Sequence, residues 1–160
     1  MAKAKKKAKG PGPLVTNRQA RRDYHIIDTL EAGISLVGTE VKSLRAGQCS
    51  LAEAFIDIRN EEAFLVNAHI GEYSHASNAY NHEPKRLRKL LLHKLEIQRV
   101  MGKALQKGFT LIPLAVHLRG RWIKVEIALA KGKHDYDKRD DIKERDSQRD
   151  VARTLREESR

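Results

Sequence analysis

Two groups of basic side chains in this sequence have the types and spacing to bind a polyanion. One is the block Pro84–Leu92, in which four of nine residues are lysine or arginine. Such side chains can pair with phosphates or stack on unpaired bases. The other lies near the C-terminus, where a helix over residues 138–160 would carry one row of mainly basic residues within a band of about 80°. The row contains Lys138, Ile142, Arg145, Arg149, Arg153, Arg156 and Arg160.

This C-terminal row predicts an RNA ligand, because a line of cations on one helix face complements a phosphate backbone. Val151 falls opposite Ile142, which leaves no apolar stripe to pack the helix on a folded body. A helix without such packing is marginal in isolation. We therefore expect a tail that is disordered in the free protein and helical in an RNA-lined groove. The alternative is a solvated helix or a disordered tail without a ligand.

No residue pattern indicates catalysis or metal binding. His69, His75 and His82 are spaced by six and seven residues, which matches no zinc pattern, and the single cysteine, Cys49, has no partner. Several acids could in principle build a metal-dependent nuclease, but surface charge and hydrogen bonding to RNA explain them better. These acids are Glu31, Glu40, Asp57 and Glu72. We predict a protein that is not an enzyme and needs no metal or other cofactor.

The charge of the chain is large and unevenly distributed. The 160 residues carry a net charge of +11, which favours a polyanionic partner. Residues 1–22 hold eight basic residues and no acid, residues 23–84 are predominantly acidic, and residues 85–130 carry eleven basic residues against two acids. The lone cysteine favours a reducing, cytoplasmic setting. No apolar run approaches the ~20 residues that span a bilayer, so no membrane partner is expected.

Hydrophobic periodicity predicts a β-rich body. Alternation over residues 24–38 indicates a hairpin that turns at Glu31-Ala32-Gly33, or one strongly bent strand, and residues 52–70 indicate a second hairpin. Between them, a short helix over residues 40–45 would be capped by Thr39 and ended by Gly47. Residues 71–85 lack periodicity and form a long loop, and residues 93–107 have helical spacing.

Two further strands follow this helix and complete the expected core. Their inward rows are Ile112, Leu114, Val116 and Leu118, and then Ile123, Val125, Ile127 and Leu129. Ala128 would face outward. About six short strands with one interposed helix predict a mainly β fold, a small antiparallel barrel of the oligonucleotide-binding (OB) type with accessory helices.

The chain divides into three parts. Residues 1–16 are expected to form a flexible basic arm, because they cannot bury enough apolar surface to become ordered. Residues 17–130 form the RNA-binding barrel domain, and residues 131–160 form the tail. Lys131-Gly132-Lys133 would serve as a flexible, cationic pivot between the barrel and the tail.

Motifs along almost the whole chain, from about Asn17 to the C-terminus, resemble the SsrA-binding protein family, also called small protein B. The first are Glu31-Ala32-Gly33 and Gly38-Thr39-Glu40-Val41-Lys42-Ser43-Leu44-Arg45-Ala46-Gly47. The later ones are Pro84–Leu92, Ala130-Lys131-Gly132-Lys133, and Asp137-Lys138-Arg139 followed by Ile142-Lys143-Glu144-Arg145. Several independent motifs in this order make a chance match very improbable.

The resemblance implies an adaptor of trans-translation. It would bind the tRNA-like domain of transfer-messenger RNA and deliver it to stalled bacterial ribosomes, which permits tagging of the nascent peptide and ribosome rescue. The tail would enter the empty mRNA channel near the decoding centre and contact 16S ribosomal RNA. Elongation factor Tu would join through the aminoacylated RNA. We expect a monomer; a structural ribosomal protein with a basic extension is the alternative.

The resemblance also implies which residues bind RNA. In the body they are Asn17, Arg21, Arg22, Glu31, Lys42, Arg45, Arg86, Arg88, Lys89 and Leu91. In the ribosome-binding tail they are Lys131, Gly132, Lys133, Tyr136, Asp137, Lys138, Arg139, Ile142, Arg145, Arg149 and Arg153. Asn17 could bond a base edge or a 2′-hydroxyl, and Glu31 could accept from a base amine or hold a neighbouring arginine. Leu91 is either a core leucine or an RNA contact.

One position departs from the family pattern. Tyr136 stands three residues before Arg139, where members of the family often have histidine. The family role there would be to stack on a ribosomal RNA base. Tyrosine keeps a planar ring, so stacking is retained, but it cannot supply the positive charge of an imidazolium.

Tyr136→Ala is therefore expected to impair accommodation on the ribosome and to leave binding to free RNA intact. The two activities are measured separately, by association with stalled ribosomes and by binding to RNA in solution. Simultaneous loss of both would contradict this division between body and tail.

Overall fold

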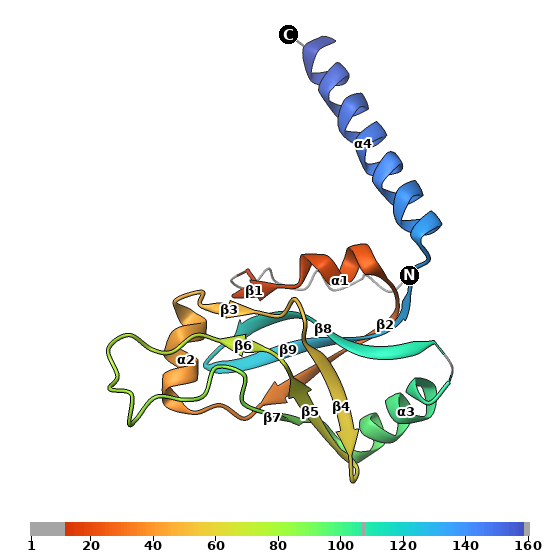
Figure 1. Cartoon of the computed structure of the whole chain (residues 1–160). Coiled ribbons are helices and arrows are strands. Elements are labelled where there is room, and N and C mark those ends of the chain that lie inside the picture. The colour runs from red at the N-terminus through yellow and green to blue at the C-terminus, as the bar shows by residue number, and fades with distance from the viewer. Residues whose placement is uncertain (1–11, 107, 159–160) are drawn as a thin grey trace, which may run out of the picture.

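A curled antiparallel sheet of seven strands forms the body of the protein in the computed structural model, which describes residues 12–106 and 108–158 (Figure 1). In spatial order the strands are β1 (Val15–Thr16), β8 (Phe109–Arg119), β9 (Trp122–Gly132), β2 (Tyr24–Ile34), β7 (Arg88–Leu91), β5 (Glu62–Val66) and β4 (Phe55–Arg59). Strand β4 packs back on β8, so the sheet curls toward a barrel. This confirms the predicted mainly β fold with accessory helices.

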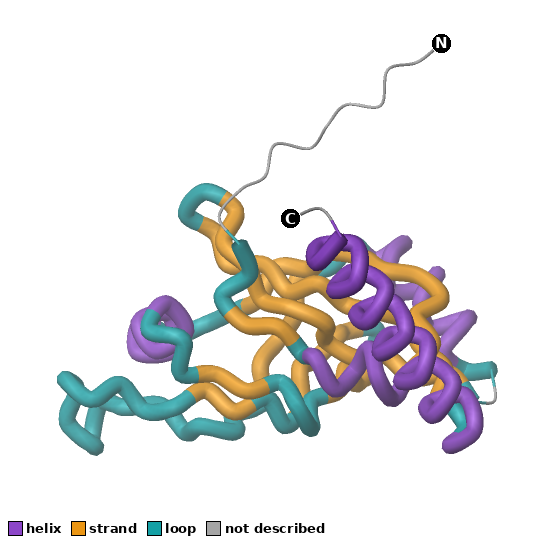
Figure 2. The backbone as a smooth tube through the Cα atoms, turned by 90° about the horizontal axis from the view of Figure 1, so that it is seen from above, coloured by secondary structure: helices purple, strands orange, loops and turns teal. Residues whose placement is uncertain are grey.

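Smaller elements lie at the margins of this sheet. A two-stranded sheet pairs β3 (Cys49–Ser50) with β6 (His69–Ile70). The helices are α1 (Arg18–Asp23), α2 (Gly38–Arg45), α3 (Lys94–Ala104) and α4 (Asp135–Glu158). Viewed from above, α2 and the loop that follows β6 lie at one end of the molecule, and α4 begins at the other (Figure 2). Within the described ranges, no helix is long and apolar enough to cross a membrane.

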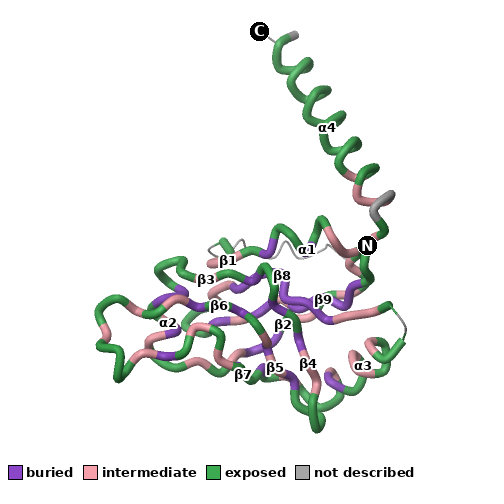
Figure 3. Tube along the Cα trace, viewed as in Figure 1, coloured by how far each residue is buried: buried purple, intermediate pink, exposed green. Residues whose placement is uncertain are grey.

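The main core fills the inside of the curled sheet. Apolar residues from every long strand are buried there, and α2 contributes Leu44 (Figure 3). Alternation along β9 behaves as expected, because Ile123, Val125, Ile127 and Leu129 all belong to this core. Burial of this continuous apolar surface is the main stabilising term of the fold.

The expected inward row of β8 is confirmed for Val116 and Leu118 and wrong for Ile112 and Leu114, because a bulge changes which face the side chains occupy. The pairing of β8 with β9 shifts between Pro113 and Ala115. One extra residue reverses the alternation, since successive side chains in a strand point to opposite faces. Val116 therefore faces the main core, whereas Ile112 and Leu114 face the other side of the sheet.

Helix α1 covers that other side and forms a second, smaller core. Ala20 of α1 packs there with Ile112, Leu114, Ala128 and Ala130. Ala128 was expected to face outward, but it is completely buried beneath α1. The sequence showed only the basic charge of residues 17–22 and did not predict α1. A helix of six residues has too few apolar positions to show a helical period.

Strand β2 is one continuous strand and not a hairpin. The pairing of β2 with β9 runs from Tyr24 to Gly33, so Glu31-Ala32-Gly33 makes no turn. A register shift between Ile26 and Asp28 bends the strand, which confirms the alternative of a bent strand. The second predicted hairpin is confirmed as β4–β5, whose turn residues Asn60 and Glu61 adopt φ angles of 50° and 60°.

The boundaries between body and extensions differ from the predicted ones. Val15 and Thr16 form β1 and pair with β8, so they belong to the body, whereas residues 1–11 lie outside the described part. At the other end β9 continues through Lys131 and Gly132, which pair with β2. A paired strand end is not a flexible pivot, so the predicted pivot is wrong.

Asn17 joins α1 to the body and is almost completely buried, at 5% exposed. Its Oδ1 caps α1 by accepting a hydrogen bond from the Ala20 amide at 3.1 Å. Its Nδ2 donates to the carbonyl oxygens of Leu51 at 3.0 Å and Pro113 at 3.1 Å. These bonds occupy the carboxamide, so the structure assigns Asn17 to the interior and not to the predicted contact with RNA.

Asn17→Ala is expected to lower the free energy of unfolding by about 2 to 3 kcal/mol. The variant loses a helix cap and removes one donor each from the carbonyl oxygens of Pro113 and Leu51, of which Leu51 keeps the Ala54 amide as a donor. Urea unfolding at neutral pH measures the loss, and Asn78→Ala, at an exposed loop position, is the matched control. Equal stability of the two variants would contradict the anchoring role.

Candidate RNA interface

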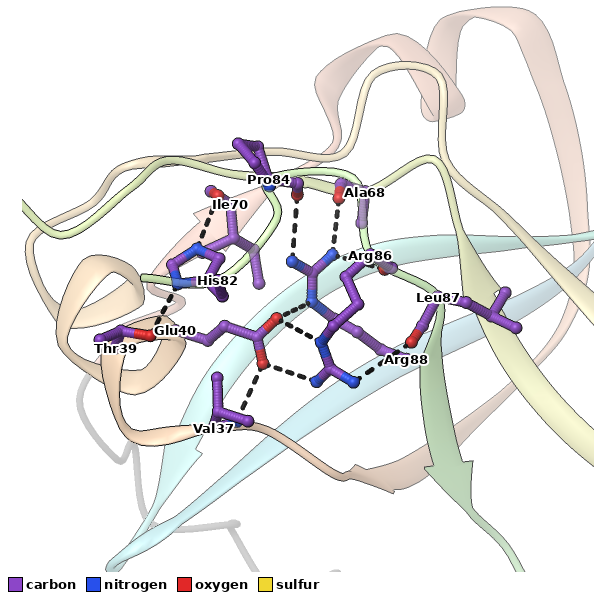
Figure 4. Close-up of polar contacts among 10 residues, drawn as sticks. All are labelled: Val37, Thr39, Glu40, Ala68, Ile70, His82, Pro84, Arg86, Leu87 and Arg88. Atoms are coloured by element: carbon purple, nitrogen blue, oxygen red, sulfur yellow. Dashed lines mark hydrogen bonds and ion pairs between the residues drawn. The ribbon is translucent and has the colours of Figure 1, made fainter. Parts of the chain in front are cut away.

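A buried carboxylate, Glu40, organises the end of the body that carries α2 (Figure 4). Its Oε1 accepts hydrogen bonds from the Nε atoms of Arg88 at 2.7 Å and Arg86 at 3.1 Å. Its Oε2 accepts from Arg86 Nη2 at 2.8 Å and from the Val37 amide at 2.9 Å. The last bond closes the first turn of α2, so the predicted cap by Thr39 is wrong, whereas Gly47 follows the helix with a φ of +75° as expected.

The charges around Glu40 keep it ionised. Burial by itself would raise the pKa of Glu40, but hydrogen bonds from Arg86 and the Val37 amide and the charge of Arg88 outweigh burial and hold that pKa below its ordinary value. A buried ion pair of this kind is sensitive to loss of either partner, because the remaining charge would stay buried without compensation.

Arg88 uses its whole guanidinium inside the protein. Besides Glu40, it donates to the carbonyl oxygens of Ala68 at 2.8 Å, Arg86 at 3.1 Å and Pro84 at 3.0 Å. Its side chain is 0% exposed. The predicted contact between Arg88 and RNA is therefore corrected: Arg88 ties β7 to the end of the preceding loop and to α2.

The loop over residues 71–87 is held against α2 by a second buried group. His82 contacts Thr39 Oγ1 through Nδ1 at 2.8 Å and the Ile70 carbonyl oxygen through Nε2 at 2.9 Å. Within the loop, the side chain of Asn81 bonds both backbone groups of Tyr73, each at 3.0 Å. The absence of helix and strand that the sequence predicted here is confirmed, but the loop has defined internal contacts.

Above this network lies a groove between α2 and the loop, which we call the α2 groove. Its lining residues are Val37, Gly38, Thr39, Lys42, Tyr80, Asn81, His82, Glu83 and Arg86. Lys42 Nζ stands 5.1 Å from the centre of the Tyr73 ring, and Tyr80 is 83% exposed. Cations beside exposed aromatic rings provide both phosphate contacts and stacking surfaces for unpaired bases. Tyr73 and Tyr80 were not among the predicted RNA-binding residues. The feature of the sequence that could have indicated them is the presence of aromatic residues in a long polar loop.

The predicted residues on α2 and at the edge of β7 are accessible. Lys42 and Arg45 are exposed on α2, and Arg86 is partly exposed beside the groove. Lys89 is exposed and pairs with Glu62 at 2.5 Å. Leu91 is 56% exposed and points away from the core, which excludes the core alternative for that residue.

Glu31 lies on the outward face of the sheet and holds two basic side chains. Its Oε2 lies 3.0 Å from His117 Nε2 and 3.1 Å from Arg119 Nη2. The hydrogen bond from His117 lowers the pKa of Glu31 most, and the charge and hydrogen bond of Arg119 lower it further against the opposing effect of burial. Of the two roles considered for Glu31, holding a neighbouring arginine is the one that this geometry shows.

The base of the tail is attached to α1 by ion pairs. Lys133 donates to the Arg21 carbonyl oxygen and forms an ion pair with Asp141, and this contact lowers the pKa of Asp141. Asp137 approaches His25 at 3.5 Å. The predicted tail residues Lys133 and Asp137 therefore orient the helix, whereas Arg21 and Arg22 are exposed in the last turn of α1.

Beyond this base, α4 projects away from the body (Figure 1). Every residue from 142 to 157 is exposed, including the predicted contacts Ile142, Arg145, Arg149 and Arg153. The predicted helix is confirmed. Its disorder in the free protein stays a prediction. Tyr136 lies in the first turn of α4, and its side chain is outside the described part.

The structure thus distributes the predicted residues over several surfaces and not one patch. Lys42 and Arg86 line the α2 groove, and Arg45 is exposed at the end of α2. Glu31 and Leu91 lie on the outward sheet face, and the tail begins at the end of the molecule opposite α2 (Figures 1 and 2). Among the described residues, no three His, Cys, Asp or Glu side chains gather around a possible metal position. The arrangement can bind a nucleic acid through cations and rings.

A protein-family model matches most of the chain. The model of the family described as "SmpB protein" matches residues 14–157. The SsrA-binding protein of Trichodesmium erythraeum is 51% identical over 154 residues, which cover 96% of this chain and 99% of that protein. The SsrA-binding protein of Thermobifida fusca is 53% identical over 158 residues, 98% of each chain.

A solved structure is also similar. It is described as "tmRNA-SmpB: a journey to the center of the bacterial ribosome", and one of its chains shares 47% sequence identity with this protein at a TM-score of 0.66. The match covers 78% of this chain and 87% of that chain. The similarity therefore extends from sequence to three-dimensional arrangement.

Glu40→Gln is expected to destabilise the protein by about 3 to 5 kcal/mol at neutral pH, because Arg88 would keep a buried charge without its partner. Since folding lowers the pKa of Glu40, its stabilising contribution is complete above the unfolded pKa of about 4.3 and is lost as pH falls through the folded pKa. The stability difference between wild type and variant should therefore shrink below about pH 4.3.

Urea unfolding at pH values from 7 down to 3.5 measures this difference. Glu53→Gln is the control, since Glu53 is an exposed carboxylate that approaches Lys85 only at 4.0 Å. A difference between wild type and Glu40→Gln that stays constant over the whole pH range would contradict the assigned role of the Glu40 charge.

Proposed function

The chain belongs to the SmpB protein family, and on that premise we propose that it is the RNA-binding adaptor of trans-translation. It would bind the tRNA-like domain of transfer-messenger RNA and deliver it to stalled bacterial ribosomes. The similar relatives are named SsrA-binding proteins, and the similar solved structure concerns transfer-messenger RNA on the ribosome. Tagging of the nascent peptide and rescue of the ribosome would follow from delivery.

The observation that carries this proposal is the separation of two cationic surfaces on one chain. The α2 groove lies at one end of the barrel, and the projecting helix α4 begins at the other (Figure 2). An adaptor needs such a separation, because it must hold one RNA while it contacts a second one. A single nonspecific basic patch would not require a helix directed away from the body.

The body would recognise the tRNA-like domain through contacts of two kinds. Arg45, Lys42 and Arg86 supply charges for phosphates, while Tyr80 and the outward sheet face supply surfaces for unpaired bases. Glu40 acts through Arg86, which it orients, and would not contact RNA itself. None of these roles needs a bond to form or break, so we propose an adaptor without enzymatic activity.

The tail would act as a probe of the mRNA channel. Its row of arginines on one exposed helix face matches the phosphates of a channel lined by ribosomal RNA. An occupied channel would exclude the helix, so insertion would report the absence of a message. We further propose a cytoplasmic monomer that meets elongation factor Tu through the aminoacylated RNA.

A tail variant separates the two recognition events. Replacing Arg145, Arg149 and Arg153 with glutamine is expected to leave affinity for a tRNA-like fragment of transfer-messenger RNA unchanged and to abolish peptide tagging on stalled ribosomes. The control replaces Glu144 and Glu157 with glutamine and Asp150 with asparagine, which lie outside the basic row. The fragment is compared with a generic RNA duplex across a salt series, because phosphate contacts weaken steeply with salt.

The outcomes distinguish the candidate functions. Wild-type protein that binds fragment and duplex equally at all salt concentrations would be a nonspecific basic binder, and the adaptor function would be refuted. A structural ribosomal protein would instead sediment with every subunit in equal amounts. The adaptor should be substoichiometric and enriched on stalled ribosomes.

A further inference from the structure

The outward face of the sheet carries a row of neighbouring side chains next to Leu91. Leu91 on β7 pairs with Gly33 on β2, Gly33 pairs with Lys124 on β9, and Lys124 pairs with His117 on β8. These pairings place the residues in one row across the sheet. A Cβ atom added to Gly33 would lie only 3.1 Å from the Leu91 Cβ. The absence of a side chain at Gly33 therefore lets Leu91 lie close to β2.

The next pair along the β8–β9 hairpin brings an arginine and a tryptophan together. Arg119 pairs directly with Trp122, and both flank the turn at Gly120, which adopts a φ of +62°. Side chains of directly opposed residues stand about 5 Å apart on the same face of a sheet. Trp122 is 69% exposed, and the neighbouring Arg121 in the turn is exposed as well.

Glu31 fixes the position of this arginine. Its carboxylate accepts from Arg119 Nε at 3.2 Å and approaches Nη2 at 3.1 Å, so one edge of the guanidinium is occupied. Among the described residues, none accepts a hydrogen bond from Nη1, which leaves that end of the guanidinium for an external acceptor. The same Glu31 oxygen lies 3.0 Å from His117 Nε2, which restricts the carboxylate from a second side.

We propose that Trp122 and Arg119 form a subsite for one unpaired nucleotide of the bound RNA, with Glu31 as the positioning residue for Arg119. The indole ring would stack on the base, and the Nη1 end of Arg119 would donate to the adjoining phosphate. This inference rests on the proposed function, because it names a further contact of the body with its RNA.

The charge and geometry of the cluster favour a nucleotide over an apolar protein segment. Arg119, Arg121 and Lys124 are neighbours of Trp122 in the β8–β9 hairpin, which places three basic residues close to the exposed indole. A stacked base with its phosphate satisfies a ring and a cation at once, and stacking on an aromatic ring is tolerant of base identity. The hairpin tip lies at the same end of the molecule as α2, so one RNA could reach both surfaces (Figure 1).

The wild-type chain allows a direct test, because Trp122 is its only tryptophan. A fluorescently labelled tRNA-like fragment of transfer-messenger RNA is titrated with the protein, and binding is followed by anisotropy of the label. In a parallel titration the intrinsic tryptophan emission is followed. Stacking should quench this emission, and the quenching should saturate at the affinity that anisotropy measures.

Variants of the exposed ring then test its contribution to affinity. Trp122→Ala should weaken binding about tenfold, and Trp122→Phe, which keeps a ring, should recover most of the loss. Leu105→Ala is the matched control, since Leu105 is also a largely exposed apolar residue but follows α3. Unchanged affinity of Trp122→Ala, or RNA binding without any change in tryptophan emission, would overturn the subsite and leave the proposed function standing.

The role of Glu31 requires a double-mutant cycle. Glu31→Gln should weaken binding about threefold or more in the wild-type background and have no further effect in the Arg119→Ala background, because it acts through that arginine. Equal losses in both backgrounds would show that Glu31 contacts RNA itself and would overturn its positioning role. Absence of any RNA binding by anisotropy would refute the proposed function together with this inference.

Discussion

The buried carboxylate of Glu40 is the constraint on which the end of the body that carries α2 depends. It is fully enclosed, and it holds Arg86, Arg88 and the first turn of α2 at the same time. A buried charge is costly unless every oxygen has a partner, so these elements must come together or not at all. The position of β7 in the sheet and the shape of the α2 groove both follow from this requirement.

The tail depends on a weaker but analogous attachment. Lys133 follows the last paired residue of β9 and contacts both α1 and Asp141 of α4, which gives the helix its direction as it leaves the body. Beyond this base, every residue from 142 to 157 is exposed. Most helical stability in proteins comes from packing of an apolar face, which α4 lacks beyond its base. The outer part of α4 can therefore become more or less ordered, depending on what surrounds it. This property suits the proposed role of the tail as a probe of an empty channel.

Polar side chains in this protein have two different roles. Some, such as Asn17 and Arg88, use their hydrogen-bonding groups inside the body and shape it. Others are held by a neighbouring side chain and remain exposed to solvent, as Lys42 is beside Tyr73 and Arg119 is beside Glu31. A held but exposed cation loses less side-chain entropy on binding than a freely rotating one, so preorganisation favours binding to a phosphate.

Local pattern in the sequence by itself determined the β-rich body, the β4–β5 hairpin, α3 and the cationic face of the tail helix, because each depends on residues a few positions apart. Only the tertiary structure decided which face Ile112 and Ala128 occupy, since a bulge in one strand reverses its alternation without changing its composition. The same holds for Asn17 and Arg88. The two carbonyl oxygens that Asn17 Nδ2 bonds lie 34 and 96 residues away in the sequence, and Glu40 lies 48 residues from Arg88. No local pattern therefore distinguishes a buried structural side chain from one that is free to contact RNA.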